Sequence, residues 1–273
     1  MDINKIKLNW RIRNNNKEAN INLWDAKADH FGNYEIPNFE DDKFLSLLLE
    51  KDLVQENYEV LDVGCGGGKY TLAIASKCNY ITGIDLSPRM IEYGNENKEK
   101  FNVNNVTFKI EDWHDLDIRN SQYYKKYDLV YASMTPAVQS YETFYKLCEA
   151  SKGYCLIRCN TKRSDSVYDE IRSILNINHN NRSSNLDFMY SFNMLCLEGY
   201  EPQTDYEEKI WYSKETIDKA YDIYIKRAKI EKNINEDEEE KIKTYLESIC
   251  EDGYICEEIK ATIATLYWSV DND

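Results

Sequence analysis

The first 160 residues alternate between helix-like and strand-like hydrophobic patterns. Apolar residues follow helical spacing after Asp42, and a short apolar strand over 58–63 then ends in a cluster of glycines. The elements expected next are helices over 69–76, 88–101 and 141–151, and strands over 80–85, 106–110, 127–133 and 154–158. Strands separated by helices are typical of βαβ units in a parallel sheet with right-handed crossovers.

Beyond residue 160 this alternation stops. Helices are expected near 165–175, 185–197, 215–227 and 236–250, with strand-like runs over 206–212 and 261–270. The segment 181–260 is therefore expected to form a mainly helical substrate cap, inserted before a last strand. Its aromatic residues could line a pocket or form the core of the cap itself.

The composition limits the partners and the compartment of the protein. The chain has 49 acidic and 34 basic residues and a formal charge of -15, so its average surface would repel a phosphate backbone. Nucleic acid is therefore not an expected partner. The chain has no run of 18 apolar residues and begins with a polar segment, which predicts a cytoplasmic protein that does not enter a membrane. Eight scattered cysteines form no C-x-x-C pair, so no metal site is expected.

The most specific motif is the glycine cluster after the first strand. Asp62, Gly64, Gly66 and Gly68 alternate with other residues where the strand ends and a helix begins. Such glycines allow a tight turn and a close approach of the backbone to a ligand. A dinucleotide-binding fingerprint would place its third glycine at position 69, which is Lys69 here, so the spacing disfavours a nicotinamide cofactor.

Acidic residues end the next two strands. Asp85 lies about 20 residues beyond the glycine turn, where a carboxylate can accept hydrogen bonds from ribose hydroxyls. Asp112 and Trp113 follow the third strand and offer an acid and an aromatic face to an adenine ring. Because ligands bind at the carboxyl ends of strands in open α/β sheets, these groups are expected to converge.

In order and spacing these residues resemble the cofactor motifs of class I S-adenosylmethionine-dependent methyltransferases, over roughly residues 24–160. The resemblance implies that Gly64 and Gly66 line the methionine part of the cofactor, Asp85 holds the ribose, and Asp112 with the Trp113 backbone holds adenine. The product would be S-adenosyl-L-homocysteine. The full set of expected cofactor-binding residues is Trp24, Asp62, Gly64, Cys65, Gly66, Gly68, Asp85, Leu86, Met90, Asp112, Trp113 and Ser133.

The resemblance also implies a fold and a domain plan. It predicts an α/β protein with a doubly wound, mostly parallel seven-stranded sheet, helices on both faces and an antiparallel last strand. An N-terminal helical segment (1–40) with the pattern Trp24-Asp25-x-x-Ala28-x-x-Phe31 would close over the cofactor. A Rossmann-like core (41–180), the cap (181–260) and the final strand (261–273) would follow.

Catalytic residues are harder to identify. The segment 131–137 lacks the D/N-P-P-Y/F motif of many amino-methylating enzymes that act on nucleic acid. The candidates for a general base are His114, His30 and Tyr131, and His179 is the remaining histidine. The expected function is methyl transfer to a small-molecule acceptor at oxygen, nitrogen, sulfur or carbon. The alternatives are a protein methyltransferase and a catalytically silent S-adenosylmethionine-binding module, with a nicotinamide oxidoreductase less favoured.

Overall fold

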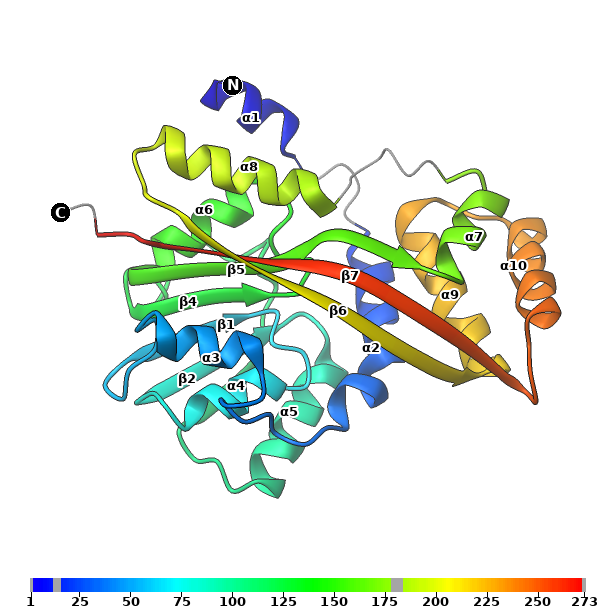
Figure 1. Ribbon diagram of the computed structural model, residues 1–273, viewed down its shortest axis with the longest axis horizontal. Coiled ribbons are helices and arrows are strands. Elements are labelled where there is room, and N and C mark those ends of the chain that lie inside the picture. Colours follow the sequence, from blue (N-terminus) through cyan, green and yellow to red (C-terminus); the bar gives the residue numbers. More distant parts are fainter. Residues whose placement is uncertain (1, 12–15, 178–183, 272–273) are drawn as a thin grey trace.

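The computed structural model describes residues 2–11, 16–177 and 184–271, and it has one seven-stranded sheet with helices on both faces (Figure 1). The strand order is β3-β2-β1-β4-β5-β7-β6, and β7 runs antiparallel to both of its neighbours. The strands are β1 (Glu59–Val63), β2 (Tyr80–Asp85), β3 (Val106–Ile110), β4 (Tyr127–Ser133), β5 (Ser151–Asp165), β6 (Gln203–Thr216) and β7 (Tyr254–Ser269). The expected doubly wound α/β fold with an antiparallel last strand is confirmed.

The helices divide between the two faces of the sheet and an extension beyond it. In the described residues they are α1 (Ile3–Asn9), α2 (Lys17–Gly32), α3 (Lys43–Glu50), α4 (Lys69–Ala75), α5 (Pro88–Lys100), α6 (Tyr141–Ala150), α7 (Tyr168–Ile174), α8 (Ser184–Leu197), α9 (Ile217–Glu231) and α10 (Glu236–Ser248). Helices α3, α4 and α5 cover one face of the sheet, while α6, α8 and α1 cover the other (Figure 1).

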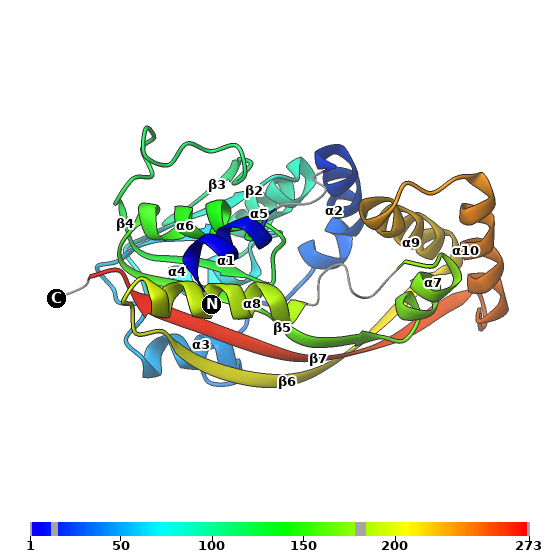
Figure 2. The ribbon, with the colours of Figure 1, turned by 90° about the horizontal axis from the view of Figure 1, so that it is seen from above.

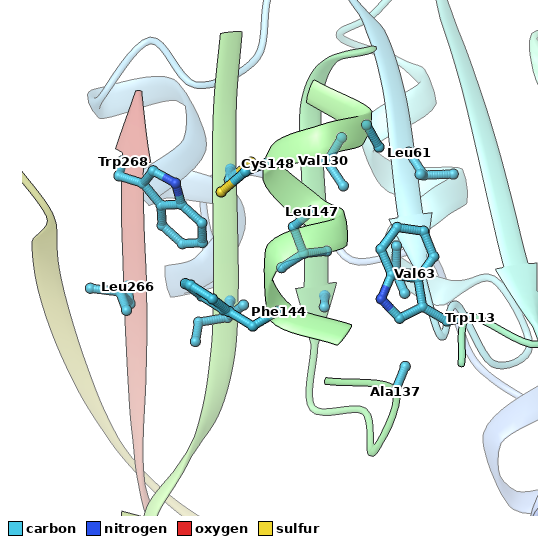
Figure 3. Packing of buried hydrophobic residues seen from close by; sticks show 14 of the residues in the cluster. Leu61, Val63, Trp113, Val130, Ala137, Phe144, Leu147, Cys148, Leu266 and Trp268 are labelled. Atoms are coloured by element: carbon cyan, nitrogen blue, oxygen red, sulfur yellow. The ribbon is translucent and has the colours of Figure 1, made fainter. Parts of the chain in front are cut away.

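Two hydrophobic clusters fill the space between the sheet and its covering helices. On the α6 side, Phe144 and Leu147 pack against Trp268 and the buried residues of β1 and β4 (Figure 3). On the other side, Phe44 and Leu48 of α3 and Ile91 of α5 pack on the sheet. Because both faces are covered, the central strands are apolar along almost their whole length.

The segment that was expected to be a helical cap is divided differently. Helix α8 lies on the core beside α6, and its Phe188 belongs to the same cluster as Phe144. Strand β6, placed inside the cap by the sequence pattern, pairs with β7 along 14 residues and forms the edge of the main sheet. The expected domain boundaries are wrong here. Alternating polar and apolar residues are typical both of a half-exposed edge strand and of a strand in an isolated hairpin, so the pattern does not show which sheet the strand joins.

The actual extension is formed by α7, α9 and α10 on the far ends of β5, β6 and β7 (Figures 1 and 2). These three strands have 15, 14 and 16 residues and continue well past β1 and β4. A separate cluster around Tyr168, Tyr224 and Leu246 forms the core of this extension. Helix α2 packs against both α5 and α9, so it connects the main sheet to the extension.

Candidate functional site

The glycine turn after β1 is held against the end of β2. The N–H groups of Gly64 and Cys65 donate to the Ile84 carbonyl, at 2.8 and 3.0 Å. Gly64, Gly66 and Gly68 have φ angles of 74°, 54° and 87°, which residues with a Cβ rarely adopt. A side chain at Gly64 would also clash with Thr135 in the loop after β4. The turn therefore presents bare backbone at the carboxyl edge of the sheet.

Asp62 and Tyr131 form a buried pair beneath this turn. The Asp62 carboxyl accepts hydrogen bonds from the Tyr131 hydroxyl at 2.6 Å and the Thr71 hydroxyl at 2.7 Å. Burial raises the pKa of Asp62 to about 7, and the two hydroxyl donors oppose that rise. Tyr131 is fully buried, and burial raises its pKa further above its usual value. The prediction of Tyr131 as a catalytic base is therefore wrong, because its hydroxyl faces the core and not an acceptor.

Asp85 lies at the end of β2 with its carboxylate facing the glycine turn. Its Oδ2 accepts the N–H of Gly66 at 2.9 Å, and its Oδ1 accepts the N–H of Ser87 at 2.9 Å. Burial raises the pKa of Asp85, while these backbone donors favour its ionised form. The carboxylate oxygens keep lone pairs that could accept ribose hydroxyls.

The loop after β3 separates the two residues expected at the adenine position. Asp112 is partly exposed and forms an ion pair with Lys17 at the start of α2, with 2.8 Å between Oδ2 and Nζ. Lys17 also contacts Asp115 at 2.7 Å. The Trp113 ring is buried in the core beside Val63 (Figure 3) and donates its Nε1–H to the Thr143 carbonyl at 2.9 Å. The prediction that the Trp113 ring offers an aromatic face to adenine is therefore wrong, and only the Trp113 backbone remains at the edge.

His114 is the histidine that the structure brings to this edge. Its backbone N–H donates to Asp112 at 2.9 Å, and Lys146 of α6 donates to its carbonyl at 2.8 Å. Partial burial lowers the pKa of its imidazole, while Asp112 and a hydrogen bond to the Pro136 backbone oppose that change. Its Nδ1 is buried with no hydrogen-bond partner in the described residues.

The remaining predicted residues surround the same turn. Met90 of α5 is buried near Gly66, Cys65 and Leu86 are half-buried, and the Oγ of Ser133 at the end of β4 is buried with no partner in the described part of the chain. Trp24 lies on α2 with its ring centroid 6.0 Å from that of Phe31. His30 is exposed, with its Nδ1 3.9 Å from a Glu215 oxygen, and His179 lies outside the described residues.

Helix α2 is attached to the carboxyl edge by contacts that local sequence patterns do not indicate. Asp25 accepts a hydrogen bond at 2.5 Å from Ser87, the N-cap residue of α5. At the C-terminal end of α2, Asn97 donates to the Gly32 carbonyl at 2.8 Å, and a Cβ on Gly67 would lie 2.8 Å from the Phe31 carbonyl. The glycine turn is thus covered directly by backbone of α2.

The family model described as "Methyltransferase domain" matches residues 54–226, more than half of the chain. The chain belongs to this methyltransferase family. The cofactor of the family is S-adenosylmethionine. The matched residues include the glycine turn, Asp85, Asp112 and most of the helices and strands around them.

Several known methyltransferases are similar to this family member. A probable cobalt-precorrin-6B C(15)-methyltransferase of Methanobrevibacter smithii is 36% identical over 69 residues, 25% of this chain and 37% of that protein. The 23S rRNA (uracil(1939)-C(5))-methyltransferase RlmD of Vesicomyosocius okutanii is 36% identical over 66 residues, 24% of this chain and 15% of that protein. The chain thus matches well under half the length of these curated relatives.

Among solved structures, the YcgJ protein from Bacillus subtilis has a TM-score of 0.50 and 19% identity, and the match covers 81% of this chain and 96% of YcgJ. This similarity supports the α/β fold described above for this chain. In the part of the chain that the structure describes, no helix is long and apolar enough to cross a membrane.

The groups at the carboxyl edge suit the cofactor of the family. The glycine turn leaves backbone exposed where side chains would otherwise fill the space. The Oγ of Ser133 and the Nδ1 of His114 have no hydrogen-bond partner in the described residues, so a ligand could supply one. A groove of about 930 Å³ lies elsewhere, at the amino edge of the sheet, lined by residues 36–40, 72, 73, 75–77 and 102–105. It contains none of the residues of the cofactor motifs.

Proposed function

We propose that this protein transfers the methyl group of S-adenosylmethionine to a small-molecule acceptor. The observation that carries the proposal is the cover over the carboxyl edge. Helix α2 packs on the glycine turn, and α9 of the extension packs on α2 (Figure 2). A covered site suits a small acceptor better than a macromolecular one.

In this proposal the cofactor lies across the ends of β1, β2 and β3. Gly64 and Gly66 line its methionine part, where the bare turn allows close approach. Asp85 accepts the ribose hydroxyls, and Asp112 accepts the adenine amine in place of Lys17. The backbone beside Trp113 contacts the adenine ring.

The proposed chemistry depends mainly on positioning. The sulfonium methyl of the cofactor is already activated, so an acceptor atom held in line can displace it, and proximity can supply about 7–11 kcal/mol in favourable cases. A general base is needed only for an acceptor that carries a proton at neutral pH. His114 suits that role because its lowered pKa keeps the imidazole neutral and its Nδ1 is unpaired within the described residues.

The charge of the chain favours a small acceptor over RNA. A formal charge of -15 opposes binding to a phosphate backbone. Similarity to the rRNA methyltransferase spans 15% of that enzyme, so it carries no information about how the rest of that enzyme holds RNA. A protein acceptor is the alternative within the same chemistry.

The first experiment measures cofactor binding by calorimetry. The wild-type protein is expected to bind S-adenosylmethionine and S-adenosylhomocysteine, with NAD much weaker. Asp85→Ala should weaken S-adenosylhomocysteine about a hundredfold, since a hydrogen bond to a charged group is worth about 1.5–3 kcal/mol. Asp85→Asn keeps the shape of the side chain and tests whether a loss reflects misfolding. Asp117→Ala, an exposed aspartate of the loop after β3, is the matched control.

The second experiment compares acceptor classes. Formation of S-adenosylhomocysteine is followed with fractionated small metabolites, with total RNA and with unfolded protein as acceptors. Turnover confined to the small-molecule fractions supports the proposal. Turnover with RNA or protein alone refutes the small-molecule assignment, and stronger binding of NAD than of the sulfur ligands refutes the cofactor assignment.

A further inference from the structure

Helix α6 holds the loop after β3 through three hydrogen bonds. The Trp113 indole donates to the Thr143 carbonyl at 2.9 Å. One turn further along α6, the Lys146 amine donates to the Trp113 carbonyl at 2.9 Å and to the His114 carbonyl at 2.8 Å. Helix α6 is itself packed into the core through the buried Phe144. The loop is therefore attached to a rigid part of the fold.

The two carbonyls that Lys146 binds belong to peptide groups whose N–H groups both bind Asp112. In a planar trans peptide, the carbonyl of one residue and the N–H of the next point in opposite directions. The peptide with the Trp113 carbonyl directs the His114 N–H to Oδ1 of Asp112, at 2.9 Å. The peptide with the His114 carbonyl directs the Asp115 N–H to the Asp112 carbonyl, at 3.0 Å. Lys146 thus fixes both peptide groups from the side opposite Asp112.

These contacts hold Asp112 in a defined orientation. Its Oδ1 accepts the His114 N–H, and its Oδ2 lies on the side of α2, where it pairs with the exposed Lys17 at 2.8 Å. Its carbonyl also accepts the Leu116 N–H at 3.1 Å, so it points into the turn. The Trp113 N–H, on the same peptide group, therefore points out of the turn, and it has no acceptor in the described residues. Adjacent residues thus present an exchangeable carboxylate oxygen and a free N–H.

This pair of groups matches one edge of adenine. The exocyclic amine of adenine donates hydrogen bonds, and the neighbouring ring nitrogen N1 accepts one. A carboxylate oxygen can accept from the amine, and a backbone N–H can donate to N1. Hypoxanthine, the deaminated base, has the opposite pattern, because a carbonyl replaces the amine and N1 carries a hydrogen. The pair is therefore suited to distinguish adenine from hypoxanthine.

We propose that Lys146 is a positioning residue for the adenine ring of the cofactor and that it supports selectivity for adenine over hypoxanthine. This inference rests on the placement of adenine in the proposed function. Lys146 acts through the two peptide groups, by keeping the Asp112 carboxylate and the Trp113 N–H directed at one edge of the base. Without the amine, the carbonyls of residues 113 and 114 lose their donor, and the two peptide groups are free to turn toward water.

A purely structural role for Lys146 has a different consequence. Loss of a contact that only stabilises the fold lowers the fraction of protein competent to bind, which weakens every ligand of the site by the same factor. Loss of orientation weakens a ligand with adenine more than a ligand with hypoxanthine. The ratio of the two affinities therefore separates the two roles, and it does not depend on the fraction of folded protein.

The test measures the affinity of the whole chain for S-adenosylhomocysteine and for S-inosylhomocysteine by calorimetry. The second ligand differs from the first only in its base, which is hypoxanthine. Lys146→Met removes the donor and keeps an unbranched chain, while Lys146→Arg keeps N–H donors. Lys98→Met is the matched control, because Lys98 of α5 donates to the Val106 carbonyl at 2.6 Å, at the opposite end of β3.

The wild type should bind S-adenosylhomocysteine about a hundredfold more tightly than S-inosylhomocysteine, since two hydrogen bonds are replaced by two mismatched contacts. Lys146→Met should reduce this ratio to about tenfold or less, whereas Lys146→Arg and Lys98→Met should keep the ratio of the wild type. An unchanged ratio in Lys146→Met overturns the inference, as does an equal fall in Lys98→Met. If Lys146→Met does not fold, Lys146→Gln, which keeps N–H donors on a shorter chain, is measured in its place by the same criteria.

Asp112→Asn separates this inference from the proposed function. It changes the group that is proposed to accept the adenine amine, so it should reduce the ratio whether or not Lys146 has a positioning role. A reduced ratio in Asp112→Asn with an unchanged ratio in Lys146→Met overturns the role of Lys146 and leaves the placement of adenine intact. An unchanged ratio in both variants, or a wild type that does not bind S-adenosylhomocysteine, overturns the placement of the cofactor as well.

Discussion

The buried pair of Asp62 and Tyr131 predicts a pH-dependent effect of a single hydroxyl group. Tyr131→Phe removes the donor that lies 2.6 Å from the Asp62 carboxyl and leaves Thr71 as the donor at 2.7 Å. The ring stays in place, so no large cavity forms. The variant therefore isolates one hydrogen bond to a buried acid.

The size of the effect follows from the charge of Asp62. Burial raises the pKa of Asp62 from 3.8 to about 7. The protonated acid therefore contributes to the free energy of unfolding fully below pH 3.8, and this contribution is lost as the pH rises through about 7. Below that value Tyr131 bonds to a neutral acid, and the loss in Tyr131→Phe should be about 1 kcal/mol. Above it the lost bond is to a carboxylate, and the loss should grow to about 2–3 kcal/mol.

Urea denaturation of the wild type and the variant at about pH 5.5 and about pH 8.5 measures this difference in unfolding free energy. Tyr127→Phe is the control, because Tyr127 is buried on the same strand and its hydroxyl contacts the neutral Thr82. The control should show the same loss at both pH values. An equal loss in Tyr131→Phe at both pH values would refute the assignment of a titrating acid beneath the glycine turn.

Two other changes test the carboxyl edge. Gly64→Ala should destabilise the protein by about 1–3 kcal/mol in thermal or urea unfolding, because its positive φ and the adjacent Thr135 both exclude a Cβ; an unchanged midpoint would contradict the described turn. Asp112→Asn should weaken S-adenosylhomocysteine about tenfold in calorimetry, whereas Lys17→Met should not weaken it, because Lys17 competes for the same carboxylate. Weaker binding in Lys17→Met would show that this lysine supports the ligand.

The sequence predicted the parts of the fold that depend on local pattern. The bounds of β2, β3 and β4 are those expected, since each strand is a short apolar run between clear turn signals. The glycine turn was also predictable, because it needs glycine at fixed positions. Asp85 and Asp112 then followed from strand ends meeting at one edge of the sheet.

Features that depend on distant contacts were not predictable in this way. Tyr131 and Trp113 carry polar atoms near the edge, yet tertiary packing directs both rings into the core. The pairing of Lys17 with Asp112 joins residues 95 positions apart, and nothing in the surrounding sequence indicates it. Strand β6 was placed in the wrong layer because its pairing with β7 is a property of the assembled sheet.

The long strands β5, β6 and β7 limit how the extension can move relative to the main sheet. β6 and β7 are paired without a break from Gln203 beside Tyr267 to Thr216 beside Tyr254, so the extension and the main sheet share one hydrogen-bonded ribbon. Swinging the extension outward as a rigid lid would require breaking or sharply bending that ribbon. Helix α2 is held by Lys17 at its N-terminal end, by Asp25 near its middle and by packing on the glycine turn at its C-terminal end, all without a shared ladder. We therefore expect ligands to exchange through displacement of α2, at a rate that depends on salt concentration because one of its contacts is an exposed ion pair.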